Sequence, residues 1–441
     1  MSTAQIAAIL ISLAVLVGVA HLLGQLLVLL RQPRLIGEIL TGAILGPFVL
    51  GRVAPSVSSA LFGDGSDPTD STKVVLGFIY WLGLLLLMFV SGSEVRKVLS
   101  GENRRPTAWI LGVGTPLPFL IALGIGSLLP LHSLAGPAGD ESAVLLILAI
   151  AVAVTSIPVI SRIFFDLGIM HTRFASLVLG SAILEDLALW AVLAVATALA
   201  ASGGLGEEVA GTMTSHIAAT LGYLLIGLLL APRLLKRLHT ARWNVLEKSS
   251  PVGYAIMLML VYASVAALVD VNLVFAAFLA GFGLVGGLGG TERVRFAVPL
   301  DAISKVSFAV FIPLYFVMVG YQLQLGNEFS LALLMAFLLG SSVLCLASVG
   351  LAARLAGFRG LEIVNLAVAQ NARGGPGIVL ASVAYEAGII NGRFFTTLVL
   401  AAILTSQAAG FWLGYVLRKG WPLLAEEPAS QPAVEKVDAS A

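Results

Sequence analysis

Long apolar runs separated by short polar segments dominate this chain of 441 residues. A helix needs about 20 consecutive apolar residues to cross the hydrocarbon core of a bilayer. That length predicts thirteen transmembrane helices, over residues 4–30, 34–51, 74–91, 107–129, 143–165, 173–201, 217–238, 251–269, 271–288, 302–323, 329–353, 362–387 and 393–417. We therefore expect an all-α, polytopic membrane protein.

The basic residues are segregated between alternate loops. The loops after the odd-numbered segments, with the end of the last segment, carry 20 of the 25 Lys and Arg residues. The alternate loops carry three, which are Arg52, Lys73 and Arg393. Because cytoplasmic loops are enriched in Lys and Arg, the pattern predicts an outside N-terminus and a cytoplasmic C-terminus in the plasma membrane. An error of one segment in the count would scramble this segregation.

Composition narrows the class of protein. Hydrophobic residues make up 59% of the chain and charged residues 11%, whereas soluble domains carry about 25% charged residues. The net charge of +1 offers no basic surface for nucleic acid. A single cysteine, Cys345, permits neither an intrachain disulfide nor a cysteine metal cage. No metalloprotease, P-loop or serine-hydrolase motif occurs, so we expect neither an enzyme nor a bound cofactor.

Two distant segments resemble each other at an offset of 220 residues, namely 166–186 and 386–406. Weaker echoes pair LTGAILG (40–46) with LAGFGLV (279–285), and LMFVSG (87–92) with PLYFVMVG (313–320). Each echo joins one predicted helix to the seventh after it, so the copies cross the membrane in opposite directions. Inverted repeats of this kind build alternating access in many secondary transporters.

The repeat defines the domain organisation. We predict one transmembrane unit over residues 1–421, in which repeat 1 covers about 4–201, a linker helix covers 217–238 and repeat 2 covers about 251–417. The remaining residues, 422–441, combine Glu and Pro with small residues, a composition that cannot pack a core. We expect a disordered cytoplasmic tail there.

Two predicted helices contain residues that interrupt helices. Thr155 and Ser156 precede Pro158 in the fifth segment. Pro158 either breaks the helix or only kinks it. The two hydroxyl groups are candidate ligands for an ion, or they bond back to carbonyl groups of their own helix. The partner segment reads Asn371-Ala-Arg373-Gly374-Gly375-Pro376-Gly377. Because this run disfavours a helix, we expect it to break there and to line a cavity. Gln370 and Asn371 are further candidate carbonyl ligands.

The sixth segment carries two adjacent carboxyl groups, Glu185 and Asp186, near its middle. A carboxylate costs at least about 3 kcal/mol at the centre of a membrane helix, so it marks a functional site. Adjacent helix positions diverge by about 100°, so one group can meet an ion while the other meets a partner. A buried carboxyl that releases its proton to a cation and reclaims it later provides the minimal chemistry of exchange. Arg373 either neutralises a carboxylate or holds the broken helices in their crossing geometry.

Five segments carry a family resemblance: RQPRLIGEILTGAILGP (31–47), LGLLLLMFVSGSEV (82–95), TSIPVISRIFFDLGIM (155–170), ILEDLALW (183–190) and IPLYFVMVG (312–320). They resemble, in order, the bacterial monovalent cation:proton antiporter-2 family, over nearly all of residues 4–417. The resemblance implies thirteen spans, a mobile core domain with crossed broken helices, elevator-like alternating access and a homodimer formed by a separate scaffold domain. It implies that Asp186 is the essential aspartate and binds Na⁺ or K⁺, with Glu185, Thr155 and Ser156 beside it.

The sequence departs from the family pattern in two places. Glu185 stands where electrogenic members carry aspartate, and the lysine that pairs with that group has no counterpart between Leu331 and Ala353. Two possibilities remain for Glu185: it carries a second proton, or it pairs with Arg373. Our leading hypothesis is Na⁺(or K⁺)/H⁺ antiport. The alternatives are proton-coupled transport of an organic solute on the same scaffold, and an ion channel or membrane sensor.

Overall fold

The structure of the chain is a computed structural model. It describes residues 1–30, 32–63, 70–94, 104–156, 160, 163–164, 167–170, 172–201, 222–223, 225–241, 244–269, 271–288, 290–326 and 329–425. Within these ranges the secondary structure is helical, with no strand and one isolated antiparallel bridge between Ala135 and Ile390. The expectation of an all-α fold is confirmed.

The helices of the described ranges follow one another with short connections. Their bounds are α1 (Thr3–Leu29), α2 (Arg34–Leu45), α3 (Leu50–Val53), α4 (Pro55–Phe62), α5 (Ser71–Glu94), α6 (Arg104–Trp109), α7 (Pro116–Gly126), α8 (Glu141–Ala153), α10 (Arg173–Ala201), α12 (Ala231–Thr240), α13 (Val245–Ser249), α14 (Pro251–Leu268), α15 (Leu273–Gly287), α16 (Gly290–Val306), α17 (Ile312–Gln322), α18 (Leu331–Ala356), α19 (Leu361–Gln370), α20 (Gly374–Glu386) and α21 (Gly392–Arg418). Single π-helical turns join α6 to α7, precede α12 and join α16 to α17.

The predicted segments correspond to helices along the described chain. The described chain contains eight helical stretches that are long and apolar enough to cross a membrane, three of which combine neighbouring helices, and α8 and α15 are shorter apolar helices. The start predicted at residue 302 is wrong, because the helix runs without a gap from Gly290 to Gln322. Its charged first half packs against α14. The helix can extend beyond its apolar part because its backbone hydrogen bonds are formed within the helix.

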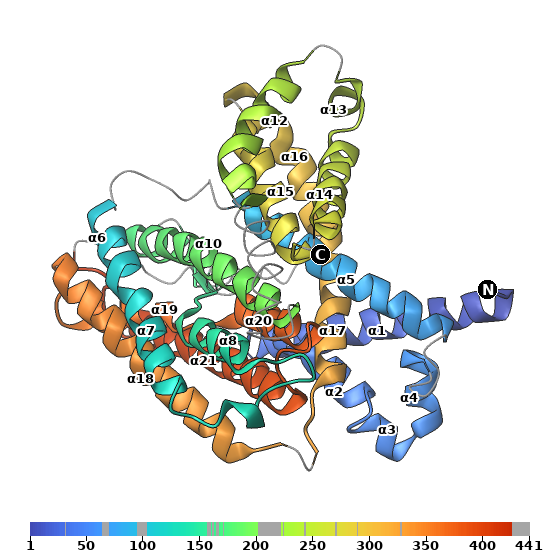
Figure 1. Cartoon of the computed structure of the whole chain (residues 1–441), viewed down its shortest axis with the longest axis horizontal. Helices are drawn as coiled ribbons and strands as arrows, with labels where there is room; N and C mark the ends of the chain where they lie inside the picture. The colour runs from blue at the N-terminus through green and yellow to red at the C-terminus, as the bar shows by residue number, and fades with distance from the viewer. Residues whose placement is uncertain are drawn as a thin grey trace, which may run out of the picture.

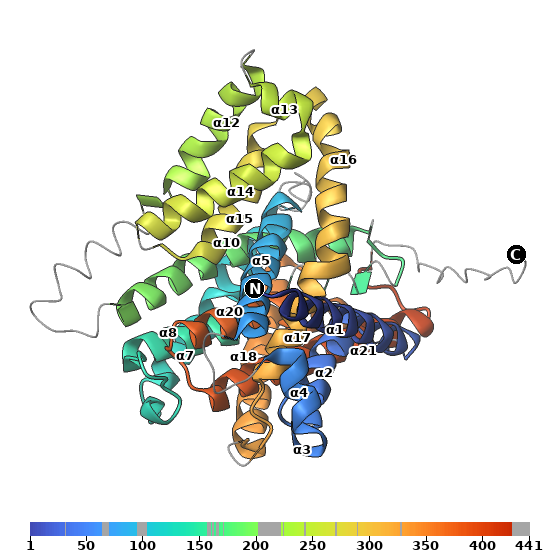
Figure 2. The ribbon, with the colours of Figure 1, turned by 90° about the vertical axis from the view of Figure 1, so that its right-hand side faces the viewer.

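The helices gather into two bundles (Figures 1 and 2). The first, which we call the scaffold bundle, comprises α1 to α5 and α12 to α17, and the second, the core bundle, comprises α6 to α8, α10 and α18 to α21. The extensive helix packing in the described part lies within one bundle or the other. Between them, the Tyr315 hydroxyl lies 3.1 Å from Ser382 Oγ, and Gln322 Nε2 donates to Glu386 Oε1 at 3.2 Å.

Glycines bring two helix pairs of the scaffold bundle into backbone contact. A side chain at Gly42 of α2 would collide with the carbonyl oxygen of Val317 in α17, and one at Gly320 of α17 would collide with that of Ile39 in α2. Helices pack this closely only where both surfaces carry small residues. The contact therefore depends on the glycines.

The same reciprocal contact joins α5 to α15. A side chain at Gly92 would collide with the carbonyl oxygen of Phe278, and one at Gly281 would collide with that of Phe89. The similarity between residues 40–46 and 279–285 matches Gly42 with Gly281, so one glycine of each pair occupies a matching position. The inverted repeat itself stays a prediction.

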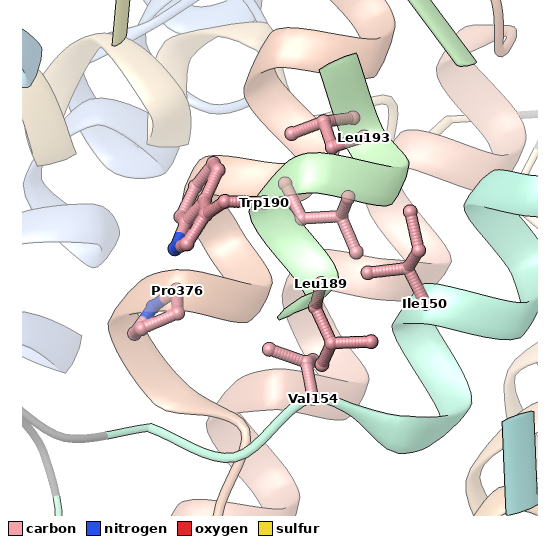
Figure 3. A pocket seen from close by; sticks show the side chains of 7 residues that line it. Ile150, Val154, Leu189, Trp190, Leu193 and Pro376 are labelled. Atoms are coloured by element: carbon pink, nitrogen blue, oxygen red, sulfur yellow. The ribbon is translucent and has the colours of Figure 1, made fainter. Parts of the chain in front are cut away.

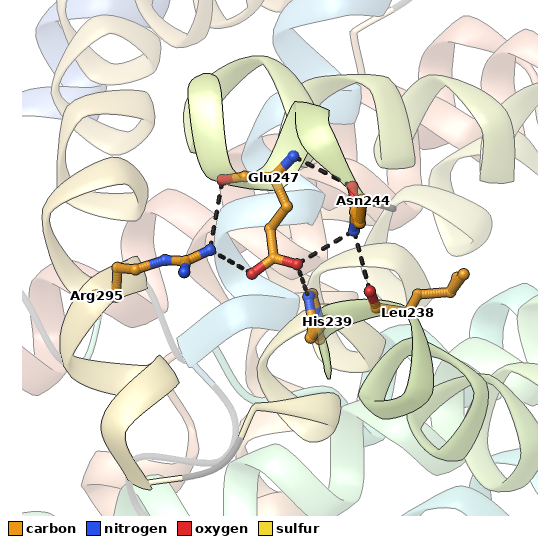
Figure 4. A network of polar contacts seen from close by, with 5 residues as sticks. All are labelled: Leu238, His239, Asn244, Glu247 and Arg295. Carbon is orange, nitrogen blue, oxygen red and sulfur yellow. Dashed lines mark hydrogen bonds and ion pairs between the residues drawn. The ribbon is translucent and has the colours of Figure 1, made fainter. Parts of the chain in front are cut away.

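A polar cluster ties together the short helices at one end of the scaffold bundle (Figure 4). The Glu247 carboxylate of α13 is almost fully buried, and it forms an ion pair with Arg295 of α16 and accepts from Asn244 Nδ2 at 3.1 Å. His239 Nδ1 of α12 lies 3.3 Å from Glu247 Oε2. Because a buried carboxylate is tolerated only with partners of this kind, the cluster fixes α12, α13 and α16 relative to one another.

The segment after α21 remains packed for a few residues beyond the predicted start of the tail. Leu423 and Leu424 are buried, Asn365 Nδ2 donates to the Leu423 carbonyl at 3.1 Å, and the Ala425 amide donates to Glu362 Oε1 at 2.7 Å. The boundary at residue 422 is therefore too early, because two leucines at this point have apolar surface to bury. Residues 426–441 lie outside the described ranges.

The glycine contacts give a test of the packing on a single helix. We expect Gly92→Ala to lower the free energy of unfolding by about 1–3 kcal/mol, because the new methyl group forces α5 and α15 apart. Gly77→Ala, also on α5, has open space around it and should leave stability unchanged or raise it by up to about 1 kcal/mol. Thermal unfolding of the two purified variants measures the difference, and equal Tm values would contradict it.

Candidate functional site

Two interrupted helices of the core bundle meet at their breaks. Helix α8 ends at Ala153, and Val154 after it is extended, with φ −70° and ψ 136°. The partner is interrupted between Gln370, where α19 ends, and Gly374, where α20 begins. The Ser156 amide donates to the Ala372 carbonyl at 2.6 Å, and the Thr155 hydroxyl donates to the Gln370 carbonyl at 2.7 Å. Each break thus supplies hydrogen-bond partners for the other.

The second break lies slightly before the residues expected to cause it. The interruption covers Asn371 to Arg373, whereas Gly374, Gly375 and Pro376 form the first turn of α20. First-turn amides have no partner within their own helix, and proline is tolerated there because it has no amide hydrogen. The glycines and proline therefore begin a half-helix rather than end one.

Hydroxyl groups from neighbouring elements satisfy the amides at the start of α20. Gly374 N donates to Ser406 Oγ of α21 at 3.0 Å, and Gly375 N donates to Ser156 Oγ at 3.1 Å. Gly374 has a positive φ of 31°, a conformation that residues with a side chain rarely adopt. Ser156 therefore joins the two breaks through both its amide and its hydroxyl.

Arg373 lies between the broken helices and is almost fully buried. Its Nη2 donates to the Val152 carbonyl, in the last turn of α8, at 3.3 Å and to Asn371 Oδ1 at 3.2 Å. The guanidinium carbon lies 5.7 Å from the centre of the Phe337 ring. A helix C-terminus carries about half a negative charge. The guanidinium group therefore lies where it can compensate the partial charge at the end of α8, and the charge compensation expected of Arg373 stays a prediction.

Glu185 is buried in a cluster of neutral polar groups. It lies on α10 with only 1% of its surface exposed, and the Thr115 and Thr155 hydroxyls face its carboxyl. One turn earlier on α10, Ser181 Oγ accepts from Gln370 Nε2. We call Thr115, Thr155, Ser181, Glu185 and Gln370 the Glu185 cluster. It combines groups from α10, the connection before α7 and both breaks.

The predicted site residues fall into three groups. Thr155 lies with Glu185, while Ser156 lies against the first turn of α20. Asp186 belongs to α10, but its side chain lies outside the described residues, as does Pro158. Thr155 thus lies beside Glu185, and the roles of Thr155, Ser156, Glu185 and Asp186 in ion binding stay predictions.

Sequence reasoning missed Thr115 and Ser181. Thr115 follows a π-helical turn over Ile110–Gly114 and precedes Pro116, at which α7 begins. Such turns change the direction of side chains and are frequent at functional sites. Proline after a threonine in a predicted span was the available signal, whereas Ser181 differs in no way from a serine bonded to its own helix.

A small apolar pocket lies beside the crossing (Figure 3). Its lining comes from α8, the connection after it, α10 and α20, and consists of Ile150, Val154, Leu189, Trp190, Leu193, Pro376 and Leu380. Apolar surroundings of this kind exclude water from the crossing.

These features define the class of the protein: a polytopic, all-helical membrane protein in which two broken helices cross beside a buried carboxyl group. Its sequence matches the family described as "Sodium/hydrogen exchanger, transmembrane" over residues 10–419. The chain belongs to this family, whose members are transporters.

Comparison with individual proteins agrees with the family. The K⁺/H⁺ antiporter 1 of Saccharomyces cerevisiae is 26% identical over 396 residues, which cover 86% of this chain and 43% of the yeast protein, so the chain spans less than half of that relative. The Na⁺/H⁺ antiporter NhaS4 of Synechocystis is 25% identical, with 92% of this chain and 96% of the relative covered. The sodium proton antiporter MjNhaP1 from Methanocaldococcus jannaschii shares the fold, with a TM-score of 0.67 at 18% identity over 93% of this chain and 98% of that one.

Arg373 provides a test of the crossing. We expect Arg373→Met to lower the free energy of unfolding by about 1.5–3 kcal/mol, because hydrogen bonds from a charged donor to Val152 and Asn371 are lost. Arg373→Lys keeps the positive charge but not the several N–H donors of the guanidinium group, and it should lower the free energy of unfolding by less than Arg373→Met does. Arg354→Met, at an exposed position in the last turn of α18, is the control. Thermal unfolding in detergent measures all three, and a stability of Arg373→Met equal to that of the control would exclude the compensating role.

Proposed function

We propose that the protein is a secondary active transporter that exchanges a monovalent cation, Na⁺ or K⁺, for H⁺ by alternating access. The observation that carries the proposal is the buried Glu185 carboxyl beside the crossing of two broken helices, in a chain of the sodium/hydrogen exchanger family. The names of the relatives include both a K⁺/H⁺ and a Na⁺/H⁺ antiporter. The ions are substrates in this proposal, and no cofactor takes part.

The proposed chemistry is competition between a proton and a cation for the same carboxyl group. Asp186 binds the cation as a carboxylate and takes up a proton when the cation leaves. Glu185, one residue earlier on α10, modulates this exchange or carries a second proton. Thr155 supplies a hydroxyl oxygen to the ion, and Ser156, which bonds to Ala372 and Gly375, holds the crossing in place.

The two bundles suggest how access alternates. The crossing lies wholly within the core bundle, whereas the scaffold bundle contains the helix pairs in backbone contact. We propose that the core bundle moves as a unit against the scaffold bundle and carries the ion site with it. The scaffold bundle would also form the interface of a homodimer in the plasma membrane, with the N-terminus outside and the C-terminus in the cytoplasm.

The apolar pocket beside the crossing bears on the principal alternative, the transport of an organic solute. Such a solute needs a cavity with several polar groups that fix its orientation. The residues that line this pocket are all apolar except for the indole nitrogen of Trp190. This pocket therefore offers an organic solute no set of polar groups, and the oxygen atoms proposed for the ion lie in the Glu185 cluster instead.

Reconstitution tests the proposed exchange. Purified protein is placed in liposomes with a pH-sensitive dye inside, an inside-acid proton gradient is imposed, and Na⁺, K⁺, Li⁺ or choline is added outside. We expect rapid alkalinisation of the interior with at least one alkali cation and none with choline. Asp186→Asn should abolish the signal, because an amide cannot release a proton.

Three outcomes separate the hypotheses. Alkalinisation that depends on the cation and is lost in Asp186→Asn supports antiport and identifies the ion. Cation flux without proton movement indicates a channel. An absence of cation-dependent proton movement across a broad pH range, in vesicles shown to contain folded protein, would overturn the proposed exchange and favour an organic solute.

A further inference from the structure

The Glu185 cluster contains three buried oxygen atoms without a hydrogen-bond partner in the described part of the chain. They are Glu185 Oε2, Thr115 Oγ1 and Gln370 Oε1. Leaving a buried polar atom unpaired costs about 1–3 kcal/mol. Each such atom in a folded protein calls for an explanation, and a bound water or ion is one of the explanations.

The three oxygens belong to one place in the core bundle. Thr155 connects two of them, because its hydroxyl faces the Glu185 carboxyl and donates to the backbone carbonyl of Gln370. Ser181 provides a second connection, since it binds the Gln370 amide group and precedes Glu185 by one turn of α10. Thr115, the residue before α7, completes the group, because its hydroxyl also faces the Glu185 carboxyl.

The orientation of the Gln370 side chain follows from its contact with Ser181. The Ser181 hydroxyl donates within its own helix, to the carbonyls of Leu177 and Val178 at 3.0 Å each. Its oxygen is then an acceptor toward Gln370, which must present Nε2 to it. The carboxamide oxygen Oε1 is left as the unpaired atom, in a side chain with no exposed surface.

We propose that Gln370 Oε1 and Thr115 Oγ1, together with Glu185 Oε2, form an inner set of ligands for the dehydrated monovalent cation and determine which cation is selected. The inference rests on the proposed exchange and goes beyond it by assigning two ligands from α19 and from the π-helical turn before α7. Carbonyl and hydroxyl oxygens replace the hydration shell of an alkali cation, and their number and placement determine selectivity. Ser181 is a positioning residue, because it acts only through Gln370.

Transport by paired variants tests the assignment. Gln370→Met keeps the length of the side chain and removes the oxygen, and Thr115→Val keeps the shape of threonine and removes the hydroxyl. Each should raise the apparent KM for the transported cation about tenfold, the change expected for about 1.4 kcal/mol of lost interaction with a charge. Each should also change the Na⁺ to K⁺ ratio of KM values, with a maximal rate closer to that of the wild type. Thr115→Ser, which restores a hydroxyl, should return the KM toward the wild-type value.

Ser181→Ala distinguishes a ligand from a structural contact. It removes the acceptor for Gln370 Nε2 but leaves Gln370 Oε1 and Thr115 Oγ1 in place. A purely structural role for Gln370 predicts the same loss of Tm and maximal rate in Ser181→Ala and Gln370→Met, with KM and selectivity unchanged in both. That result, or a Thr115→Val variant with the KM of Thr115→Ser, would overturn the inference.

The wild-type protein and Asp186→Asn are measured in the same vesicles. A wild type without cation-dependent proton movement contradicts the proposed exchange itself. Exchange that is normal in the wild type and absent in Asp186→Asn, with unchanged KM values in Gln370→Met and Thr115→Val, contradicts only the ligand assignment. If Gln370→Met does not fold, the Thr115→Val and Thr115→Ser pair decides the question.

Discussion

Every backbone amide and carbonyl in the apolar interior needs a hydrogen-bond partner, and the crossing of the two broken helices meets this requirement with very few groups. Ser156 bonds to Ala372 through its amide and to Gly375 through its hydroxyl, while Thr155 bonds to Gln370. A membrane helix can be interrupted only where protein or a water-filled cavity supplies such partners. Each interruption is therefore possible because the other lies against it, and the loss of one would leave the other with unpaired groups.

The same interruptions create the electrostatic character of the site. They expose half-helix ends in a region that contains few charged side chains, and helix ends carry partial charges. Arg373 compensates the end of α8 through Val152 and is held by Asn371, and both of these hydrogen-bond acceptors are neutral oxygens. Glu185 lies instead among hydroxyl and amide groups. Because the two groups have separate partners, the structure favours a Glu185 that is available for the ion or for a proton. It argues against neutralisation of Glu185 by Arg373.

Much of this architecture could be predicted from the sequence, because the strongest constraints are local. The apolar segments follow from the thickness of the bilayer, and the interruption near Asn371 follows from the Gly and Pro residues after it. The exact position of the break could not be predicted. It depends on the hydroxyl oxygens of Ser406 and Ser156, which accept hydrogen bonds from the amides of Gly374 and Gly375. For Thr115 the proline after it was a weak signal, but its place beside Glu185 results from a π-helical turn and from the packing of α10. Partners distant in sequence decide these features, and a single sequence does not reveal them.

The two bundles differ in the kind of contact that holds them together, and this difference bears on motion. Within the scaffold bundle, glycines allow α2 to touch α17 and α5 to touch α15 at the backbone, so that these pairs are closely packed. Between the bundles, α17 and α20 are joined by side-chain contacts such as that of Tyr315 with Ser382, and side-chain hydrogen bonds of this kind can be exchanged for others at low cost. A rigid frame beside a separately packed core is the arrangement that alternating access requires. In the proposed exchange, the crossing and the Glu185 cluster would move together, because both lie inside the core bundle, and the hydrogen bonds that stabilise the broken helices would stay formed.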